Sequence, residues 1–592
     1  MTGKQMSARP SSPLQWRKPV TPAVMAGLFT TVMIAPITFI LVFGLLPPFW
    51  GDPHRGVFTE VHFAWSIATD IAWTGIVDAA RHLLPVIPAS WGAGDWIASL
   101  HEHGSWGEFI FRIRMVMAST IWVAALIVMR AYRRTWRIQG FEHISGPRLF
   151  EGCHAARQAR MTMRREGRIT RDALYLAYNL ALSKSREVLS FAYIGGQGSG
   201  KTTALKFLMR QLIGRKKTKI ILLDQKGDLT EQWPASDVIL LAPHDQRSHA
   251  WDIGADVAGE IAAQEFAATL VSTKGPETVW PEGARQIIEA VVIALQRRYG
   301  TDWGFAELLE ALQASPEGLR GIVEPVRPDV LTFLGIDDNG EFTRTSIGYI
   351  TNLQTAALPL LRPLAMAWGS VPQAERVSLR AWLHSKGPVA QTLLLQNNTD
   401  FPEISAGWMR QVIQRLVRIS GSPSFRNDAK RRIWFILDEF PQLGHVPDLL
   451  RVPETHRSKG ATLVLTAQSI SQIYSIYGRE DGDTLINLMQ TKIILKPGQG
   501  SDLASRLNAW LGKFRWRDPM ESGITETGAR VPIKEHEDDL LTPAYLNSLG
   551  PEGKSISGLV IGLGPDVFKM EWPEQKWPKQ RPGVRLAPWA QA

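Results

Sequence analysis

The pattern of apolar and polar residues divides the chain into a membrane-type part and a globular part. Val24 to Leu46 is an uncharged run of about 23 residues, long enough to cross a bilayer core. A second apolar run, Met115 to Met129, is long enough only if Phe111 and Ile113 extend it and flanking arginines reach the headgroups. Beyond residue 186, short apolar runs alternate with helical patterns. This alternation predicts an α/β fold with a parallel sheet.

Charges around the two apolar runs predict a transmembrane helical hairpin. The flanking cations are Lys4, Arg9, Arg17 and Lys18 before the first run, and Arg130, Arg133, Arg134 and Arg137 after the second. The positive-inside rule then places both ends in the cytoplasm. A cleaved signal peptide is the alternative for the first run, but that run is longer than an h-region and no small-residue cleavage site follows it. A third span over Val61 to Val77 would bury Asp70 and carry the globular part out of the cell, so we do not predict it.

Helical patterns such as Ile287 to Arg297 and Phe305 to Leu312 interrupt the alternation of strands and helices, and they predict an all-α insertion. The predicted parts are a cytoplasmic N-terminus (1–23), transmembrane helix 1 (24–46), a periplasmic segment (47–113), transmembrane helix 2 (114–130), a juxtamembrane linker (131–185), an α/β domain in two pieces (186–254 and 371–575), the all-α insertion (255–370) and a basic, proline-rich tail (576–592).

The stretch FAYIGGQGSGKTTALK has the spacing of a nucleotide phosphate-binding loop. Backbone N–H groups can converge on a phosphate only where glycines leave room for it, and a lysine and a hydroxyl complete the site. Val188 to Ile194 before the loop predicts a strand, and Lys201 to Ile213 after it predicts a helix. The predicted nucleotide-binding residues are Gly195, Gly196, Gln197, Gly198, Ser199, Gly200, Lys201, Thr202 and Thr203, with Lys201 also catalytic. A glycine-rich turn that binds nothing is the alternative.

Two later strand patterns end in polar residues that suit the same chemistry. Ile433 to Leu437 is followed by Asp438 and Glu439, which has the form of a Walker B strand. We predict that Asp438, with Thr202, holds Mg²⁺ and that Glu439 accepts a proton from the attacking water. Gln468 follows the strand pattern Leu463 to Thr466 and could orient water or sense the γ-phosphate; capping a helix is its alternative role.

Composition narrows the class of protein. With 592 residues, 45% hydrophobic and 21% charged, the chain can form two or three folded domains. One cysteine, Cys153, excludes an internal disulfide framework. The net charge of +10 suits an anionic partner, although a basic soluble surface would give the same value. The sequence contains neither an NKxD-like guanine-binding element nor an LSGGQ signature, so we predict ATP as the nucleotide and a motor outside the ABC class.

The order of motifs resembles the type IV coupling proteins of conjugation and type IV secretion, the TraD-like (TraD/TraG) group. The resemblance rests on the N-terminal hairpin, the phosphate loop, DQKGDL, AWDI, DEFPQLGHVPDLL and QSISQIYSIYG, and it spans most of the chain. It implies a RecA-like P-loop NTPase that forms a homohexamer at the bacterial inner membrane. It also implies ATP and Mg²⁺ as cofactors, and delivery of relaxase-bound single-stranded DNA to the secretion channel. Unlike some relatives, the sequence shows no long acidic C-terminal extension.

By the same resemblance, Arg457 in ETHRSKGATL corresponds to an arginine that reaches the ATP site of a neighbouring subunit. A plain surface cation near Arg451 and Lys459 is its alternative. Three other functions remain to be weighed: a coupling ATPase for protein effectors, an FtsK-type DNA translocase, and a membrane scaffold with a degenerate site. The intact Lys201 and acidic pair argue against the scaffold.

Overall fold

The computed structural model describes residues 16–17, 34–35, 37–38, 101–102, 104, 106–134, 137–138, 142–271, 279–385, 390–428, 430–517 and 535–591. These residues fall into two compact units. The N-terminal unit lies within residues 14–144 and 515–536, and the sheet unit takes in 145–514 and 537–591. The described residues 515–517 and 535–536 were predicted as part of the α/β domain, but they group with the N-terminal unit.

The described residues of the N-terminal unit form one long helix, α4 (Trp106–Arg134). Its Trp106–Met129 portion is the one segment of the described chain that is long and apolar enough to cross a membrane. The helix begins eight residues before the predicted start at residue 114. Arg112, one of the flanking arginines expected to reach toward the headgroups, pairs one turn back with Glu108 at 2.6 Å, so the two charges compensate each other.

The predicted first span, residues 24–46, lies outside the described residues except for four helical positions, Ile34, Ala35, Ile37 and Thr38. The Thr38 hydroxyl lies 2.8 Å from the hydroxyl of Thr120 in α4. The predicted N-terminus and most of the periplasmic segment also lie outside the described residues. Short strands complete the unit: β1 (Trp16–Arg17) pairs with β2 (Arg137–Ile138), and β3 (Glu142–Ser145), β14 (Phe514–Arg517) and β15 (Glu535–Asp538) form a sheet in the order β15-β14-β3.

An 11-stranded sheet organises the sheet unit. Its order is β4 (Leu149–Phe150), β18 (Gly564–Pro573), β17 (Ser555–Gly562), β13 (Thr491–Ile494), β7 (Phe191–Ile194), β12 (Ala461–Ala467), β11 (Arg432–Leu437), β8 (Thr218–Asp224), β10 (Thr392–Gln396) and β9 (Val238–Leu241), with β16 (Gly550–Glu552) beside β17. The strands from β13 to β9 are parallel, as predicted, whereas β17 runs antiparallel to β13. Burial on both faces explains their continuous apolar sequences.

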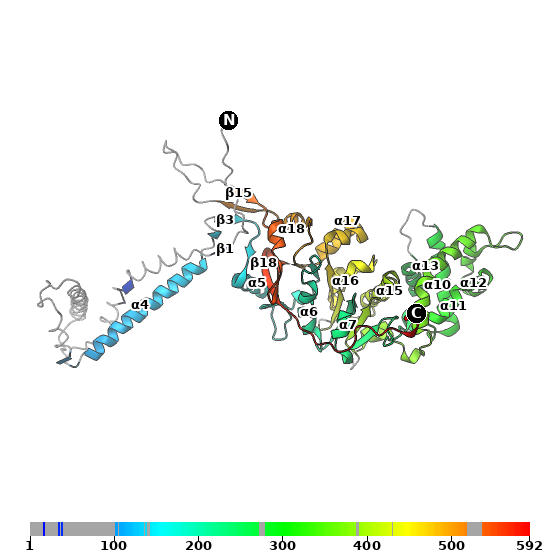
Figure 1. Ribbon diagram of the computed structural model, residues 1–592, viewed down its shortest axis with the longest axis horizontal. Coiled ribbons are helices and arrows are strands. Elements are labelled where there is room, and N and C mark those ends of the chain that lie inside the picture. Colours follow the sequence, from blue (N-terminus) through cyan, green and yellow to red (C-terminus); the bar gives the residue numbers. More distant parts are fainter. Residues whose placement is uncertain are drawn as a thin grey trace, which may run out of the picture. The chain divides into compact units, whose positions relative to one another are not determined.

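Helices flank this sheet and form the insertion between β9 and β10. The flanking helices are α5 (Gly152–Glu166), α6 (Lys201–Leu212), α7 (Asp228–Gln232), α15 (Pro402–Gly421), α16 (Arg451–Thr455), α17 (Ile470–Leu488), α18 (Leu503–Leu511) and α19 (Pro543–Asn547). The insertion contains α8 (Ile253–Asp256), α9 (Glu260–Leu270), α10 (Val279–Tyr299), α11 (Phe305–Leu312), α12 (Pro316–Val323), α13 (Arg344–Trp368) and α14 (Leu379–His384). Helices therefore continue beyond the predicted boundary at residue 370, and α10 to α13 gather at one end of the unit (Figure 1).

Much of the predicted juxtamembrane linker is integral to the sheet unit. β4 pairs with β18, where Leu149 lies opposite Val567. Beside this pair, Arg148 forms an ion pair with Asp566 at 2.8 Å. The linker also supplies α5 and the hairpin of β5 (Tyr175–Ala177) and β6 (Leu180–Ala181). The sequence could not reveal this arrangement, because β4 is only two residues long and its partner lies some 400 positions away.

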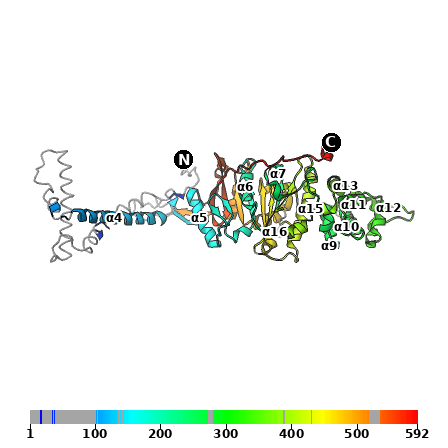
Figure 2. The ribbon, with the colours of Figure 1, turned by 90° about the horizontal axis from the view of Figure 1, so that it is seen from below.

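The predicted basic tail is an ordered strap over the sheet. This C-terminal strap, residues 574–591, runs from β18 across the unit to the insertion helices (Figure 2). Its backbone bonds to segments that follow the carboxyl ends of β8 and β9: Gln580 N to Glu231 O at 2.7 Å, and Ala587 N to His244 O at 2.7 Å. Some of its basic residues form contacts within the chain; Arg581, for example, donates a hydrogen bond to Thr230 O.

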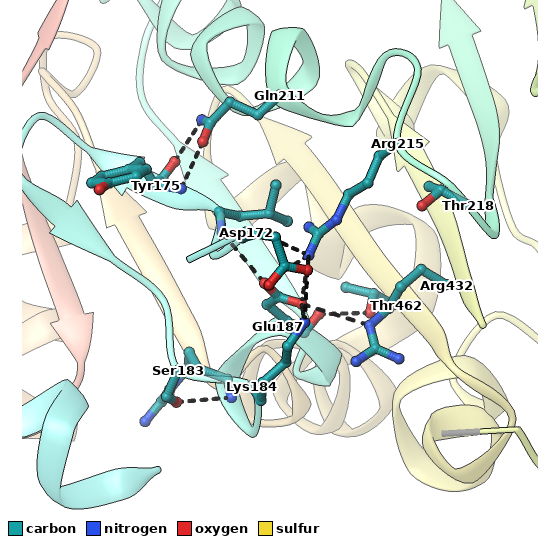
Figure 3. Close-up of polar contacts among 12 residues, drawn as sticks. Asp172, Tyr175, Ser183, Lys184, Glu187, Gln211, Arg215, Thr218, Arg432 and Thr462 are labelled. Carbon is teal, nitrogen blue, oxygen red and sulfur yellow. Dashed lines mark hydrogen bonds and ion pairs between the residues drawn. The ribbon is translucent and has the colours of Figure 1, made fainter. Parts of the chain in front are cut away.

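A buried carboxylate joins the strands at the opposite, amino edge of the sheet (Figure 3). Glu187, just before β7, has a fully buried side chain that accepts hydrogen bonds from Arg215 at 3.1 and 3.2 Å. Arg432, at the start of β11, lies 3.7 Å from the same carboxylate. Thr462, at the start of β12, donates to the Glu187 carbonyl. Glu187 thus connects the segment before the phosphate loop to two other strands.

We expect Glu187→Ala to lower the free energy of unfolding by about 3–5 kcal/mol, because it removes the one buried carboxylate that the largely buried guanidinium groups of Arg215 and Arg432 share. The measurement is chemical denaturation of the full chain in detergent, followed by tryptophan fluorescence. Asp172→Ala is the matched control, since Asp172 pairs with the same Arg215 from an exposed position and should leave the denaturation midpoint unchanged. Equal midpoints for Glu187→Ala and the unmodified chain would contradict this role.

Candidate functional site

The glycine-rich loop between β7 and α6 forms a close-fitting cradle. A Cβ on Gly195 would lie 2.7 Å from Ser199 Oγ, and one on Gly196 would lie 2.8 Å from Gly498 N. Gly200 has a φ of +91° and packs against Ile556, so it tolerates no side chain. The loop opens directly into α6, whose first N–H groups have no partners within the helix. Such an arrangement binds phosphate groups.

Lys201 occupies the base of this cradle. Its ammonium group donates to Gly195 O at 2.7 Å and to Gly196 O at 3.1 Å. Burial lowers the pKa of Lys201, and this effect is opposed by the nearby Glu439 and Asp438 carboxylates. A bound polyphosphate would add its negative charge to that of the two carboxylates and would therefore favour the charged form of the lysine.

The carboxyl ends of neighbouring parallel strands bring the other predicted residues to the same edge. β12 lies between β7 and β11, so Gln468 after β12 falls between the loop and the acidic pair after β11. The Thr466 hydroxyl donates to Asp438 at 2.7 Å and accepts from Glu439 N at 2.7 Å. Burial of the carboxylate raises the pKa of Asp438.

Glu439 has the geometry of a functional residue. Its backbone is left-handed, with a φ of +49°, one of three such non-glycine residues in the described chain. Strain of this kind concentrates at functional sites. Its Oε1 atom is buried and meets no hydrogen-bond partner among the described residues, and the same holds for Ser199 Oγ. Both atoms are available to a ligand in the cradle.

These residues line a common cavity of about 430 Å³. Its walls include residues 196–203, Glu439 and Gln468, together with Lys226, Pro551, Gly553, Lys554, Ser555, Ile556 and Glu574. Gly195 and Asp438 border the loop and the strand end but do not line the cavity itself. Gln468 does not cap the next helix, because Ser469 is the residue whose side chain accepts from Gln472 N. The capping alternative for Gln468 is therefore wrong.

The sequence did not identify several cavity residues. Lys226 was noted only within DQKGDL, and the buried Asp224 carboxylate fixes its loop by accepting from Gly227 N at 3.0 Å and Thr230 N at 2.6 Å. This loop follows β8, next to β11, which brings Lys226 to the acidic side of the cavity. The β16–β17 hairpin supplies the facing wall from more than 350 positions beyond the loop. No local sequence signal marks that contact.

Arg457 lies apart from the cavity. It belongs to a 3₁₀ turn (His456–Lys459) immediately before β12, whereas Gln468 follows the other end of that strand. Seven residues of strand separate the two ends by roughly 20 Å. Arg457 is exposed, and no carboxylate pairs with it in the described part of the chain, while Arg451 pairs with Asp448 at 2.9 Å. Arg457 therefore does not reach the cavity of its own chain.

The residues present fit Mg²⁺ and a nucleoside triphosphate. Thr202 offers a hydroxyl at the cradle and Asp438 a carboxylate beside it, a small ligand set that suits Mg²⁺ completed by phosphate oxygens and water. No cluster of three or more His, Cys, Asp or Glu residues that could hold a metal occurs among the described residues. A metal here would thus depend on the phosphates for its remaining ligands.

Comparison with known proteins agrees with this geometry. The family model described as "Type IV secretion-system coupling protein DNA-binding domain" matches residues 175–537. Coupling protein TraD of Escherichia coli (strain K12) is 24% identical over 328 residues, which cover 54% of this chain and 43% of TraD. The chain thus matches less than half of that relative's length.

Two solved structures show the fold. The bacterial conjugative coupling protein TrwBdeltaN70, in an unbound form, matches with a TM-score of 0.62 and 17% identity over 76% of this chain and 99% of its own. The coupling protein TrwB in complex with ADP and Mg²⁺ matches with a TM-score of 0.59 and 18% identity, covering 76% of this chain and 98% of its own. The predicted α/β fold is therefore confirmed.

Proposed function

Since the chain belongs to the family of type IV secretion-system coupling proteins, we propose that it is the membrane-anchored ATPase that couples DNA to a conjugative secretion channel. Its substrate would be relaxase-bound single-stranded DNA, and its other partners would be components of the channel. The observation that carries the proposal is the convergence of Lys201, Glu439 and Gln468 on one cavity at the carboxyl edge of the sheet. The family match sets aside the FtsK-type alternative.

ATP hydrolysis follows from the roles that these side chains can take. The cradle N–H groups and Lys201 would hold the β- and γ-phosphates, and Lys226 would add positive charge from the acidic side. Glu439 would accept a proton from water as the water oxygen bonds to the γ-phosphorus and the bond to the bridging oxygen breaks. Gln468 would orient that water. Mg²⁺, held through Thr202 and Asp438, would neutralise charge on the phosphate oxygens; the ADP and Mg²⁺ bound to TrwB support this assignment.

A two-span anchor in the bacterial inner membrane places the sheet unit in the cytoplasm. α4 supplies one span. The contact between Thr38 and Thr120 supports a second helix packed along it, because hydroxyl pairs join helices within membranes. Basic residues at both ends of the predicted hairpin favour the cytoplasmic side for both termini.

A homohexameric ring would complete the active site. Arg457 is roughly a strand's length from its own cavity, so a head-to-tail ring is the arrangement that lets it reach a nucleotide. A ring with a central channel would also give DNA a path. The all-α insertion would then be carried by each subunit at the end of its sheet.

We expect single-stranded DNA to stimulate ATP hydrolysis by the full chain in detergent, and the stimulation to fade as salt rises. Released counterions make the logarithm of DNA affinity fall by about 0.7 per phosphate contact for each decade of salt. The measurement is phosphate release with single-stranded or double-stranded DNA over a salt series. Hydrolysis indifferent to DNA at every salt concentration would instead favour a coupling ATPase for protein effectors.

A further inference from the structure

Helix α5 carries an unusual concentration of exposed arginines. The α5 arginine face consists of Arg157, Arg160, Arg164 and Arg165, continued by Arg168 just beyond the helix; all five are exposed. Among the residues that the structure describes, no carboxylate pairs with any of them. The helix has one acidic residue, Glu166, and that residue forms an ion pair with Arg186 of the sheet unit at 2.9 Å. The positive charge is therefore not compensated within the unit.

The helix holds these side chains on a fixed surface. Ala155, Ala159 and Met163 on its other side are fully buried, and α5 packs against β18. At about 100° per residue, Cys153, Arg157, Arg160 and Arg164 lie within an arc of about 60°. Cys153 is exposed and is the one cysteine in the sequence. The face is thus a rigid cationic stripe with a unique exposed thiol at its start.

Guanidinium groups bind phosphate oxygens well, so phospholipid headgroups and nucleic acid are the two candidate ligands. Two observations favour lipid. Seventeen residues separate Arg134, where α4 ends, from Gly152, where α5 begins, which is a reach of at most about 60 Å from the end of the helix that contains the candidate span. In addition, the family match to a DNA-binding domain begins at residue 175, after this helix.

We propose that the α5 arginine face docks on anionic phospholipid headgroups of the leaflet that the sheet unit faces. The proposal rests on the membrane anchoring proposed above. Basic clusters close to a membrane span on its cytoplasmic side bind anionic lipid in this way, and tethering by α4 keeps the surface within reach. Docking would give the sheet unit a second, charge-dependent contact with the membrane.

The test labels Cys153 of the full chain with an environment-sensitive fluorophore. The labelled protein is placed in nanodiscs of phosphatidylcholine alone or mixed with phosphatidylglycerol, each with a headgroup-region spin-labelled lipid as quencher. We expect strong quenching only with phosphatidylglycerol, and its loss at high salt. The Arg157→Gln, Arg160→Gln, Arg164→Gln variant should weaken docking by about 10²-fold, since each arginine contributes about fivefold.

A matched variant separates location from net charge. This variant, Arg298→Gln, Arg344→Gln, Arg479→Gln, lacks three exposed arginines of other elements. The fluorescence of its Cys153 label should be quenched to the same extent as in the unmodified chain. Quenching that is equal in both lipids would overturn the proposal, as would a response to single-stranded oligonucleotide in neutral nanodiscs that the triple α5 variant loses. Failure to enter nanodiscs at all would overturn the membrane anchor and this proposal together, whereas ATP hydrolysis measured on the same samples reports the motor separately.

Discussion

Lys201→Ala is expected to reduce ATP hydrolysis by at least about 10²- to 10³-fold, to background. The ammonium group is the one cation at the base of the phosphate cradle, where it already bonds to Gly195 O and Gly196 O. Removal of one preorganised donor from a site of developing charge has an effect of this size. Folding should be nearly unaffected, because burial disfavours the lysine's charged form. Removal of the side chain leaves only the Gly195 and Gly196 carbonyls without their donor, next to the open cavity.

Phosphate release by the full chain measures this effect, and thermal denaturation checks the fold. Lys206→Ala is the matched control: Lys206 lies one and a half turns along α6, bonds to Gln232 at 2.7 Å, and does not line the cavity. It should retain hydrolysis close to that of the unmodified chain. DNA transfer that survives in Lys201→Ala would remove the motor hypothesis, whatever the hydrolysis assay shows.

Arg457→Ala is expected to lower hydrolysis by about 10³- to 10⁵-fold, the usual effect of removing an arginine finger. The reason is geometric. Arg457 precedes the amino end of β12 while the cavity lies past its carboxyl end, so the side chain can stabilise transition-state charge only across a subunit boundary. Nucleotide binding to isolated subunits should therefore be unchanged, and only assembled rings should lose activity.

Mixing two inactive variants tests action across subunits. A ring containing both Arg457→Ala and Lys201→Ala subunits has complete sites wherever the intact cradle of the first meets the intact Arg457 of the second, about one interface in four for equal random mixing in a head-to-tail ring. We expect partial recovery of hydrolysis. Arg451→Ala, which removes a neighbouring arginine already paired with Asp448, should stay active. No recovery in rings shown to be mixed would contradict the role of Arg457.

The sequence predicted local motifs better than contacts between distant residues. The phosphate loop, the acidic pair and Gln468 could be read directly, because each is a few contiguous residues at the end of a buried strand. The core strands were also predictable, since burial on both faces leaves apolar runs. The second span was predicted from residue 114 whereas α4 begins at Trp106, and the compensation of Arg112 by Glu108 within that extra length is visible only on the helix.

The sequence by itself determined the chemistry that we propose for this protein: a phosphate cradle, a metal-binding carboxylate, a proton acceptor and a membrane-type apolar run each need particular residues at short spacing. Only the tertiary structure decided which distant segments complete them. It placed Lys226 and Ile556 in the cavity wall, added β4 to the far edge of the sheet, turned the basic tail into a strap, and put Arg457 beyond reach of its own site. Such contacts depend on the summed packing of surfaces hundreds of residues apart, and no single stretch of sequence encodes that sum.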